Sequence, residues 1–271
     1  RGHRVLISEA ISYAQKEKLT SILLTYEPSP KKIMRKLTLD SRLTTHEEKK
    51  MILANTGLDM VIFYPVSKDT LRISARNFLR NFLLERLSMR HLVMGNDHHF
   101  GYNRRGNATY LKAAQARYGF TLSIVEEQLT HGKRTSSSRI REALAQGDTP
   151  EAADIIGRPY SVTGIVIRGE MRGRTIGFPT ANLKLDPEKL LPAIGVYKGI
   201  TVLENGERIT SVANLGKKPT AGNFPVGVEI HLLNFTQDLY GKHLTFEFGK
   251  RLRAEKKFAN FEELRAQIAT D

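Results

Sequence analysis

The sequence predicts two domains of different class: a parallel α/β domain, followed by an antiparallel sheet or small β-barrel. The first observation is the length, because 271 residues are enough for two ordinary domains with separate cores. The second is the alternation of helical and strand patterns in the first half. The third is a change near residues 156–160, after which short β-rich segments follow one another without a helical pattern between them.

Helical and strand patterns alternate through the first half. Helical spacing of apolar residues, or a capping signal, is found over 5–15, 45–55, 78–87 and 109–118. Short apolar runs typical of buried strands lie at 21–26, 60–64, 91–94 and 122–125. This order predicts a parallel sheet with helices on both faces. A further helix is expected to begin near Ser138 and to run through Ala145.

The second half is rich in β-forming residues. The β-rich segments are separated by Gly, Pro and Asn and cover 160–168, 196–203, 208–215, 228–235 and 243–248. They predict an antiparallel sheet or a small barrel. A last helix is expected from near Asn260 to the end of the chain, because Glu263 follows three residues later.

Composition limits the chemistry that the chain can perform. There is no cysteine, which excludes disulfides, thiolate catalysis and cysteine-ligated zinc. No apolar run approaches the roughly 18 residues of a membrane span, and no signal-peptide pattern stands at the front. We therefore expect a cytoplasmic protein without membrane contact. The chain begins at Arg1 without an initiator methionine, and we expect its natural start to lie upstream.

Basic residues outnumber acidic ones by 42 to 28, which gives a formal charge of +14. Such a charge suits nucleic acid or small phosphorylated molecules as partners, and equally a solvated surface. The basic residues are spread along the chain, in runs no longer than pairs such as Lys31-Lys32. No zinc-finger, basic-zipper or aromatic RNA-binding signature accompanies them, which disfavours nucleic acid.

A stretch rich in glycine and arginine follows the first β-rich segment. It contains Gly169, Arg172, Gly173, Arg174 and Gly177. Glycines let the backbone approach a ligand, and N–H groups with guanidinium charges cradle phosphate. Taken alone, the stretch also fits an ordinary hairpin loop. Thr180 and Asn182 follow Pro179 and add a hydroxyl and an amide oxygen, which are hard ligands suited to magnesium beside a nucleotide phosphate.

The run from Gly177 to Asn182 resembles the signature of riboflavin kinases, including the C-terminal module of bacterial bifunctional riboflavin kinase/FAD synthetases. Further elements of that module follow in order over residues 157–271. The resemblance implies a six-stranded Greek-key barrel, with the C-terminal helix after it. It also implies that Mg²⁺ and the ATP phosphates are held by Thr180 and Asn182, with the glycine-rich stretch beside them.

Glu229 matches the catalytic glutamate of that family, and the resemblance implies that it acts as the base on the terminal ribityl hydroxyl of riboflavin. Phosphoryl transfer needs such a carboxylate beside the metal and the phosphates. Glu229 lies in an otherwise apolar strand, so the residue pattern alone also fits an outward-facing position on an alternating strand. His231 lies two residues on, on the same strand face. We assign it no role, because such a histidine more often packs or orients than acts as a second base.

Gly2-His3 resembles the end of the His-x-Gly-His phosphate-binding signature of nucleotidyltransferases. Segments that resemble the FAD synthetase domain of the same bifunctional proteins follow in the usual order at 25–30, 43–49, 95–101 and 136–141. The resemblance implies a Rossmann-like nucleotidyltransferase domain over residues 1–156. In such a domain His3 would stabilise charge on the α-phosphate.

The same resemblance assigns two further groups of residues. Asp97 would position the nucleotide or the flavin, although His98 stands where an aromatic residue is usual. The ATP phosphates would be bound by Ser136, Ser137, Ser138 and Arg141. The serines can also simply cap the helix that follows them, and both interpretations can hold because a capped helix start is an anion site.

Together these resemblances imply a bifunctional enzyme. ATP would phosphorylate riboflavin to FMN in residues 157–271, and a second ATP would adenylylate FMN to FAD in residues 1–156, with Mg²⁺ in both reactions. One alternative is a monofunctional riboflavin kinase with a regulatory or nucleotide-binding N-terminal domain. Another is a basic nucleic-acid-binding or regulatory protein. The expected partners are riboflavin, FMN, FAD and ATP, and the sequence carries no indication of an oligomeric state.

Overall fold

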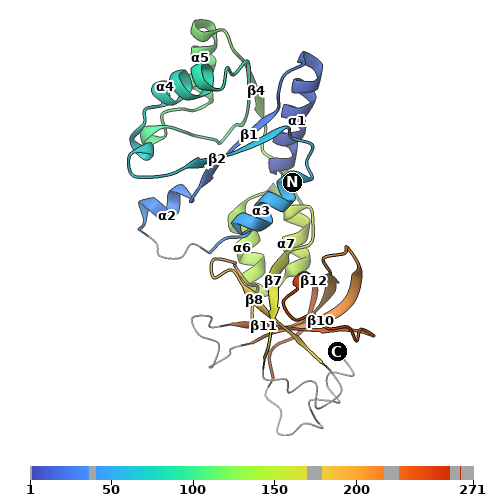
Figure 1. Cartoon of the computed structure of the whole chain (residues 1–271). Coiled ribbons are helices and arrows are strands. Elements are labelled where there is room, and N and C mark those ends of the chain that lie inside the picture. Colours follow the sequence, from blue (N-terminus) through green and yellow to red (C-terminus); the bar gives the residue numbers. More distant parts are fainter. Residues whose placement is uncertain (1, 37–40, 170–178, 217–225, 257–262, 264–271) are drawn as a thin grey trace. The chain divides into compact units, whose positions relative to one another are not determined.

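The computed structural model describes residues 2–36, 41–169, 179–216, 226–256 and 263 (Figure 1). The chain forms two compact units, the first made of residues 1–40 and 46–135, and the second of residues 41–45 and 136–271. Each unit has its own cluster of buried apolar side chains. The predicted boundary between residues 156 and 157 separates the domains expected to carry the two activities, and it stays a prediction.

The first unit is built on parallel strand pairs. Each pair joins two strands that are neighbours along the chain: β1 (Ile22–Glu27) with β2 (Met60–Pro65), and β3 (His91–Gly95) with β4 (Thr121–Val125). The predicted parallel pairing is therefore confirmed. Within the described residues, the pairs form separate two-stranded sheets rather than one continuous sheet. The sequence did not predict the short antiparallel hairpin of β5 (Leu129–Thr130) and β6 (Lys133–Arg134).

The helices of the first unit occupy the predicted segments. These are α1 (Gly2–Glu17), α3 (His46–Ala54) and α5 (Ala108–Tyr118). The segment predicted over 78–87 is helical too, but it is a π-helix, η2 (Phe78–Arg86), which continues from α4 (Ala75–Asn77). The sequence did not predict the short helices α2 (Pro30–Met34), η1 (Thr70–Arg72) and η3 (Tyr102–Arg104).

The core of the first unit is aromatic where η2 faces the strands. Leu79 and Leu111 are fully buried at its centre. The ring of Phe78 lies with its centroid 5.4 Å from that of Tyr64 and 5.5 Å from that of Phe100. Removing apolar surface from water is the main stabilising contribution in such a cluster, so these rings fix η2 against β2.

The second unit contains a closed barrel of six antiparallel strands in the order β10-β11-β8-β7-β12-β9 (Figure 1). The strands are β7 (Ser161–Ile167), β8 (Ala181–Leu185), β9 (Gly195–Val202), β10 (Arg208–Gly216), β11 (Gly227–Leu232) and β12 (His243–Arg253). The predicted barrel is confirmed. Strand β8 was missed although Asn182 and Lys184 alternate with apolar residues, which is the pattern of a half-buried strand.

Helices α6 (Ser137–Gln146) and α7 (Thr149–Ile156) share the buried core of the barrel, to which they contribute Leu144 and Ile155. The sequence predicted α6 but not α7. Residues 41–45 belong to the same unit: the backbone N–H of Arg42 donates to the carbonyl of Glu188 at 2.6 Å, and the ammonium of Lys189 donates to the carbonyl of Leu43 at 3.0 Å.

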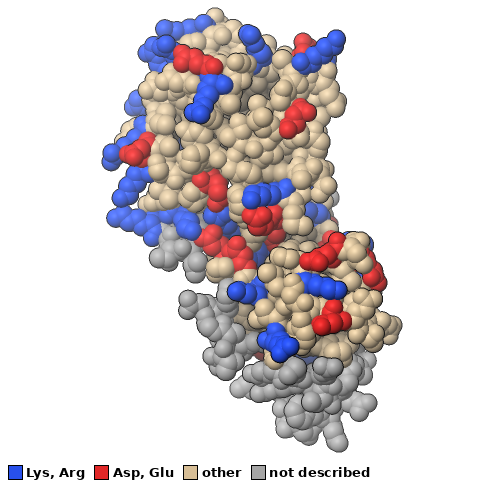
Figure 2. Space-filling view, viewed as in Figure 1, with Lys and Arg blue, Asp and Glu red and all other residues tan. Residues whose placement is uncertain are grey.

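Several predicted features lie outside the described residues. They are the phosphate-loop residues Arg172, Gly173, Arg174 and Gly177, and the C-terminal helix apart from Glu263. No helix in the part of the chain that the structure describes combines the length and the apolar character needed to cross a bilayer. Figure 2 shows basic side chains on the first unit with acidic ones between them, in keeping with the spread of charge along the sequence.

Candidate active sites

Asn182 and Glu229 lie directly opposite one another on neighbouring strands of the barrel. In the antiparallel pairing of β8 with β11, each is the register partner of the other. Directly opposed residues point to the same face of a sheet, with Cβ atoms about 5 Å apart. The fold therefore brings the proposed phosphate ligand and the proposed base together.

This pair lies on the outer face of the barrel wall. Along β11, Val228, Ile230 and Leu232 are buried and fill the barrel, whereas Glu229 and His231 are half-buried. Since successive residues of a strand point to opposite faces, Glu229 and Asn182 point away from the core. Glu229 thus faces outward, as its strand pattern allowed, but it does so beside another polar side chain.

Asn182 is only 8% exposed although it lies on the outer face. Gly169, the residue two places beyond the end of β7, leaves the room for it, because a methyl group at position 169 would overlap the Asn182 amide. The sequence assigned Gly169 to phosphate binding. In the structure it accommodates the side chain of the neighbouring candidate ligand.

Thr180 adjoins this pair at the start of β8. Continuing the register from Ala181 and Ile230 by one residue brings Thr180 opposite His231. The Nδ1–H group of His231 donates a hydrogen bond of 2.9 Å to the carbonyl of Pro179, the residue before Thr180. The segment that carries Thr180 is thereby connected to the strand that carries Glu229.

Sequence reasoning missed Asn214, which lies on the other side of Glu229. It is the register partner of Glu229 in the pairing of β10 with β11, and it is half-buried. Asn182, Glu229 and Asn214 form a polar row across three strands. The motif over 212–216 contains this asparagine, but only the register of the folded sheet places it beside the carboxylate.

The donor atoms of this outer face suit a metal-bound nucleotide. The Thr180 hydroxyl, the Asn182 amide oxygen and the Glu229 carboxylate are hard oxygen ligands of the kind that Mg²⁺ takes. The amide N–H groups of Asn182 and Asn214 can donate hydrogen bonds to phosphate or hydroxyl oxygens. A carboxylate in such surroundings can deprotonate an alcohol that attacks the phosphate.

In the first unit, His3 on α1 and Asp97 after β3 lie close enough for their charges to interact. The pKa of His3 is lowered, chiefly by desolvation from surrounding protein atoms, although the residue is exposed at the surface. Lys49 lowers this pKa further, whereas the carboxylate of Asp97 raises it. The imidazole is therefore favoured in its neutral form near pH 7.

His98 belongs to the same neighbourhood. Its pKa is also lowered, first by desolvation and in smaller part by the charges of His99, His3 and Arg104, while Asp97 raises it. Asp97 forms an ion pair with Arg134 of β6, and Arg134 also lies 3.0 Å from a carboxylate oxygen of Glu127. The sequence did not predict Arg134 as a neighbour of Asp97, because the hairpin that carries it was missed.

In the second unit, the serine run forms the start of α6. Ser136 is the N-cap, and its hydroxyl accepts a hydrogen bond of 3.3 Å from the backbone N–H of Arg139. The capping interpretation is confirmed for Ser136. Ser137 and Ser138 are exposed in the first turn, and Arg141 is half-buried one turn along. The start of a helix presents N–H groups and positive potential that can bind phosphate.

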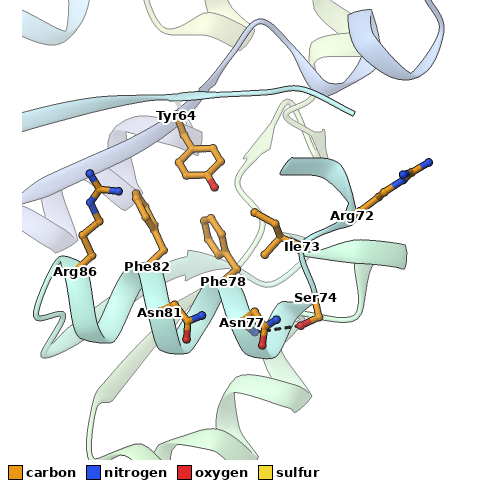
Figure 3. Close-up of a pocket in the computed structure, with 9 residues that line it drawn as sticks. All are labelled: Tyr64, Arg72, Ile73, Ser74, Asn77, Phe78, Asn81, Phe82 and Arg86. Atoms are coloured by element: carbon orange, nitrogen blue, oxygen red, sulfur yellow. Dashed lines mark hydrogen bonds between the residues drawn. The ribbon is translucent and has the colours of Figure 1, made fainter. Parts of the chain in front are cut away.

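Two adjoining cavities of about 440 and 450 Å³ lie between β2 and η2 in the first unit. Both are lined by Tyr64, Phe82 and Arg86. Figure 3 shows the ring of Tyr64 facing the rings of Phe78 and Phe82. Aromatic walls suit a planar ring, and guanidinium groups suit anions or ring faces. None of the predicted site residues that the structure describes lines these cavities.

Comparisons with known proteins cover both halves of the chain. A family model described as riboflavin kinase matches residues 156–271, and one described as FAD synthetase matches residues 1–139. The chain is 36% identical to the bifunctional riboflavin kinase/FMN adenylyltransferase of Escherichia coli K12, over all of its own length and 86% of that protein. For the protein of the same name from Haemophilus influenzae, the identity is 34% over the whole chain and 87% of the relative.

A solved structure supports the same fold. The crystal structure of a macrolide-efflux protein from Streptococcus pneumoniae has a TM-score of 0.89 at 28% identity, and the match covers 100% of this chain and 88% of that one. That likeness bears on the arrangement of the backbone. With both family models matched in order and full-length relatives above 30% identity, the chain belongs to the family of bifunctional riboflavin kinase/FMN adenylyltransferases.

Proposed function

We propose that the chain phosphorylates riboflavin to FMN and then adenylylates FMN to FAD, with ATP as the donor in both reactions. The matches to both family models and to bifunctional relatives favour this over a monofunctional kinase or a nucleic-acid-binding protein. The structural observation that carries the kinase is the register pairing of Asn182 with Glu229 on one face of the barrel.

In the kinase reaction, the Glu229 carboxylate accepts the proton of the terminal ribityl hydroxyl while the oxygen of that hydroxyl attacks the γ-phosphorus of ATP. The bond to the β,γ-bridging oxygen breaks, and ADP leaves with the electron pair. Thr180 and Asn182 would hold Mg²⁺, which would neutralise charge on the phosphates. The proposed phosphate contacts also include Gly169, Arg172, Gly173, Arg174 and Gly177.

In the adenylyl transfer, a phosphate oxygen of FMN attacks the α-phosphorus of ATP, and pyrophosphate leaves. The proposed role of His3 is to stabilise the charge that develops on the α-phosphate. Ser136, Ser137, Ser138 and Arg141 contact the ATP phosphates. Asp97 positions the nucleotide or the flavin. A cytoplasmic location, where ATP is available, remains a prediction.

Separation of the products tests the proposed function directly. The full-length natural protein is incubated with riboflavin, ATP and MgCl₂, and FMN and FAD are resolved by chromatography. Both products are expected to form in sequence. FMN without FAD would support the monofunctional kinase. A salt-dependent shift of RNA or DNA with no flavin turnover would support the nucleic-acid-binding alternative instead.

Arg141→Ala is expected to lower the rate of FAD formation from supplied FMN by about 10²-fold, because a charge-assisted contact to phosphate is lost in the transition state. Riboflavin phosphorylation should be unchanged. Arg139→Ala is the matched control on the same helix, since that side chain pairs with Glu151 at 2.5 Å and its loss should affect stability only. Equal rates of FAD formation for Arg141→Ala and wild type would contradict the role of Arg141.

Gly169→Ala is expected to slow FMN formation by on the order of 10²-fold, because the new methyl displaces the Asn182 amide and small misplacements of catalytic groups cost that much. Because the displaced group is the end of a side chain, the thermal midpoint should change little. Gly206→Ala is the control, since nothing lies within 4 Å of a methyl there. An unchanged kinase rate in Gly169→Ala would show that the position of Asn182 is immaterial.

A further inference from the structure

We propose that His231 is a positioning residue for phosphoryl transfer: it fixes the carbonyl of Pro179 and thereby holds Thr180 beside Glu229. This inference rests on the proposed kinase function. It concerns a residue that sequence reasoning left without a role. Three observations carry it, namely the hydrogen bond, the position of that bond at the end of the strand ladder, and the strand face that His231 shares with Glu229.

The hydrogen bond defines which nitrogen of His231 carries a proton. Its Nδ1 atom lies 2.9 Å from the carbonyl oxygen of Pro179. A carbonyl oxygen can only accept, so Nδ1 must be the donor. That nitrogen is committed to the backbone of another segment. The bond therefore links the imidazole to the Pro179 segment and orients that segment.

The bond lies where the strand ladder ends. The register of β8 with β11 runs from Leu183 opposite Val228 to Ala181 opposite Ile230. Pro179 has no backbone N–H group, so it cannot donate to a continuation of that ladder. The imidazole of His231 provides a side-chain bond at this point. It ties down the backbone immediately before Thr180.

The shared strand face makes this bond relevant to the chemistry. His231 and Glu229 are two residues apart on β11, so both point to the outer face of the barrel. Thr180 and Asn182 stand in the same relation on β8, with Asn182 opposite Glu229. The four side chains thus occupy one small area. If the Pro179 carbonyl is released, the Thr180 hydroxyl is the group whose distance from Glu229 changes most directly.

Replacement of His231 by Leu and by Asn tests the proposal. An asparagine amide nitrogen can occupy nearly the place of Nδ1 and can donate to the same carbonyl, whereas leucine cannot. We measure kcat and KM for MgATP in FMN formation, the rate of FAD formation from supplied FMN, and the thermal midpoint. His243→Leu is the control, because it removes an exposed imidazole at the start of β12 in the same barrel.

His231→Leu is expected to lower kcat/KM for MgATP at least about 10-fold, since displaced catalytic groups lose that much or more. FAD formation and the thermal midpoint should stay close to wild type, and His231→Asn should recover most of the kinase rate. His243→Leu should behave as wild type. A wild-type rate in His231→Leu, or an Asn variant no better than the Leu variant, overturns the proposal. Absence of FMN formation by the wild-type protein would instead refute the kinase function itself.

Discussion

Glu229→Gln is expected to reduce the rate of FMN formation by about 10²- to 10⁴-fold, the usual contribution of a general base. The amide has the size of the carboxylate but cannot take the proton of the ribityl hydroxyl. Its place opposite Asn182 and Asn214 on the barrel wall should be unchanged, because the strand register does not depend on the charge. Binding of ATP should therefore persist, as measured by titration with a fluorescent nucleotide.

Two controls make the Glu229→Gln result specific. FAD formation from supplied FMN should continue at the wild-type rate, since the residues proposed for adenylyl transfer are untouched. Glu247→Gln removes another carboxylate of the same barrel, one that pairs with Arg208 at 2.6 Å, and it should leave FMN formation unchanged. Near-normal turnover in Glu229→Gln would remove Glu229 from the role of base.

Phe246→Ala is expected to destabilise the barrel by about 3–5 kcal/mol, the usual effect of truncating a fully buried phenylalanine. Its side chain is 0% exposed, and its ring centroid lies 5.0 Å from that of Phe248. It also contacts the backbone opposite: a methyl group at Gly199 would come within 2.5 Å of this ring. The cavity left by the alanine would therefore be large and apolar.

Unfolding by denaturant, monitored through the kinase activity, measures this loss of stability. The activity reports on the barrel rather than on the first unit. Leu233→Ala is the control in the same unit: that side chain is 41% exposed, and its truncation should cost less than about 1 kcal/mol. A Phe246→Ala loss as small as that of the control would mean that the neighbouring side chains collapse into the vacated space.

The strand patterns of the sequence predicted much of the fold, because buried strand positions are filled by apolar residues. The apolar runs of β1 to β4 and the β-rich segments of the barrel are both visible in this way. Other elements leave weaker marks. Helix α7 is short, although Asp148 caps it and Pro150 stands in its first turn. Apolar spacing in 78–87 predicts a helix but does not distinguish α from π hydrogen bonding.

The sequence supplied candidate residues for the kinase site but not their arrangement in space. The family motif named Thr180, Asn182 and Glu229, yet their separation in the sequence says nothing about which face of which strand carries them. Only the pairing of β8, β11 and β10 places Asn182 and Asn214 on either side of Glu229. The contact between His231 and Pro179 also depends on tertiary register, and so no local pattern could reveal it.

Strand β11 presents Val228 and Ile230 to the barrel interior and Glu229 and His231, the proposed base and positioning residue, to the outer face. The same stretch of backbone thus carries side chains that stabilise the barrel and side chains proposed to act in catalysis. Laboratory evolution that selects for survival at high temperature by repacking around Ile230 will shift Glu229 as well. Such variants should acquire compensating substitutions on β8 or β10 before they regain the original rate of FMN formation.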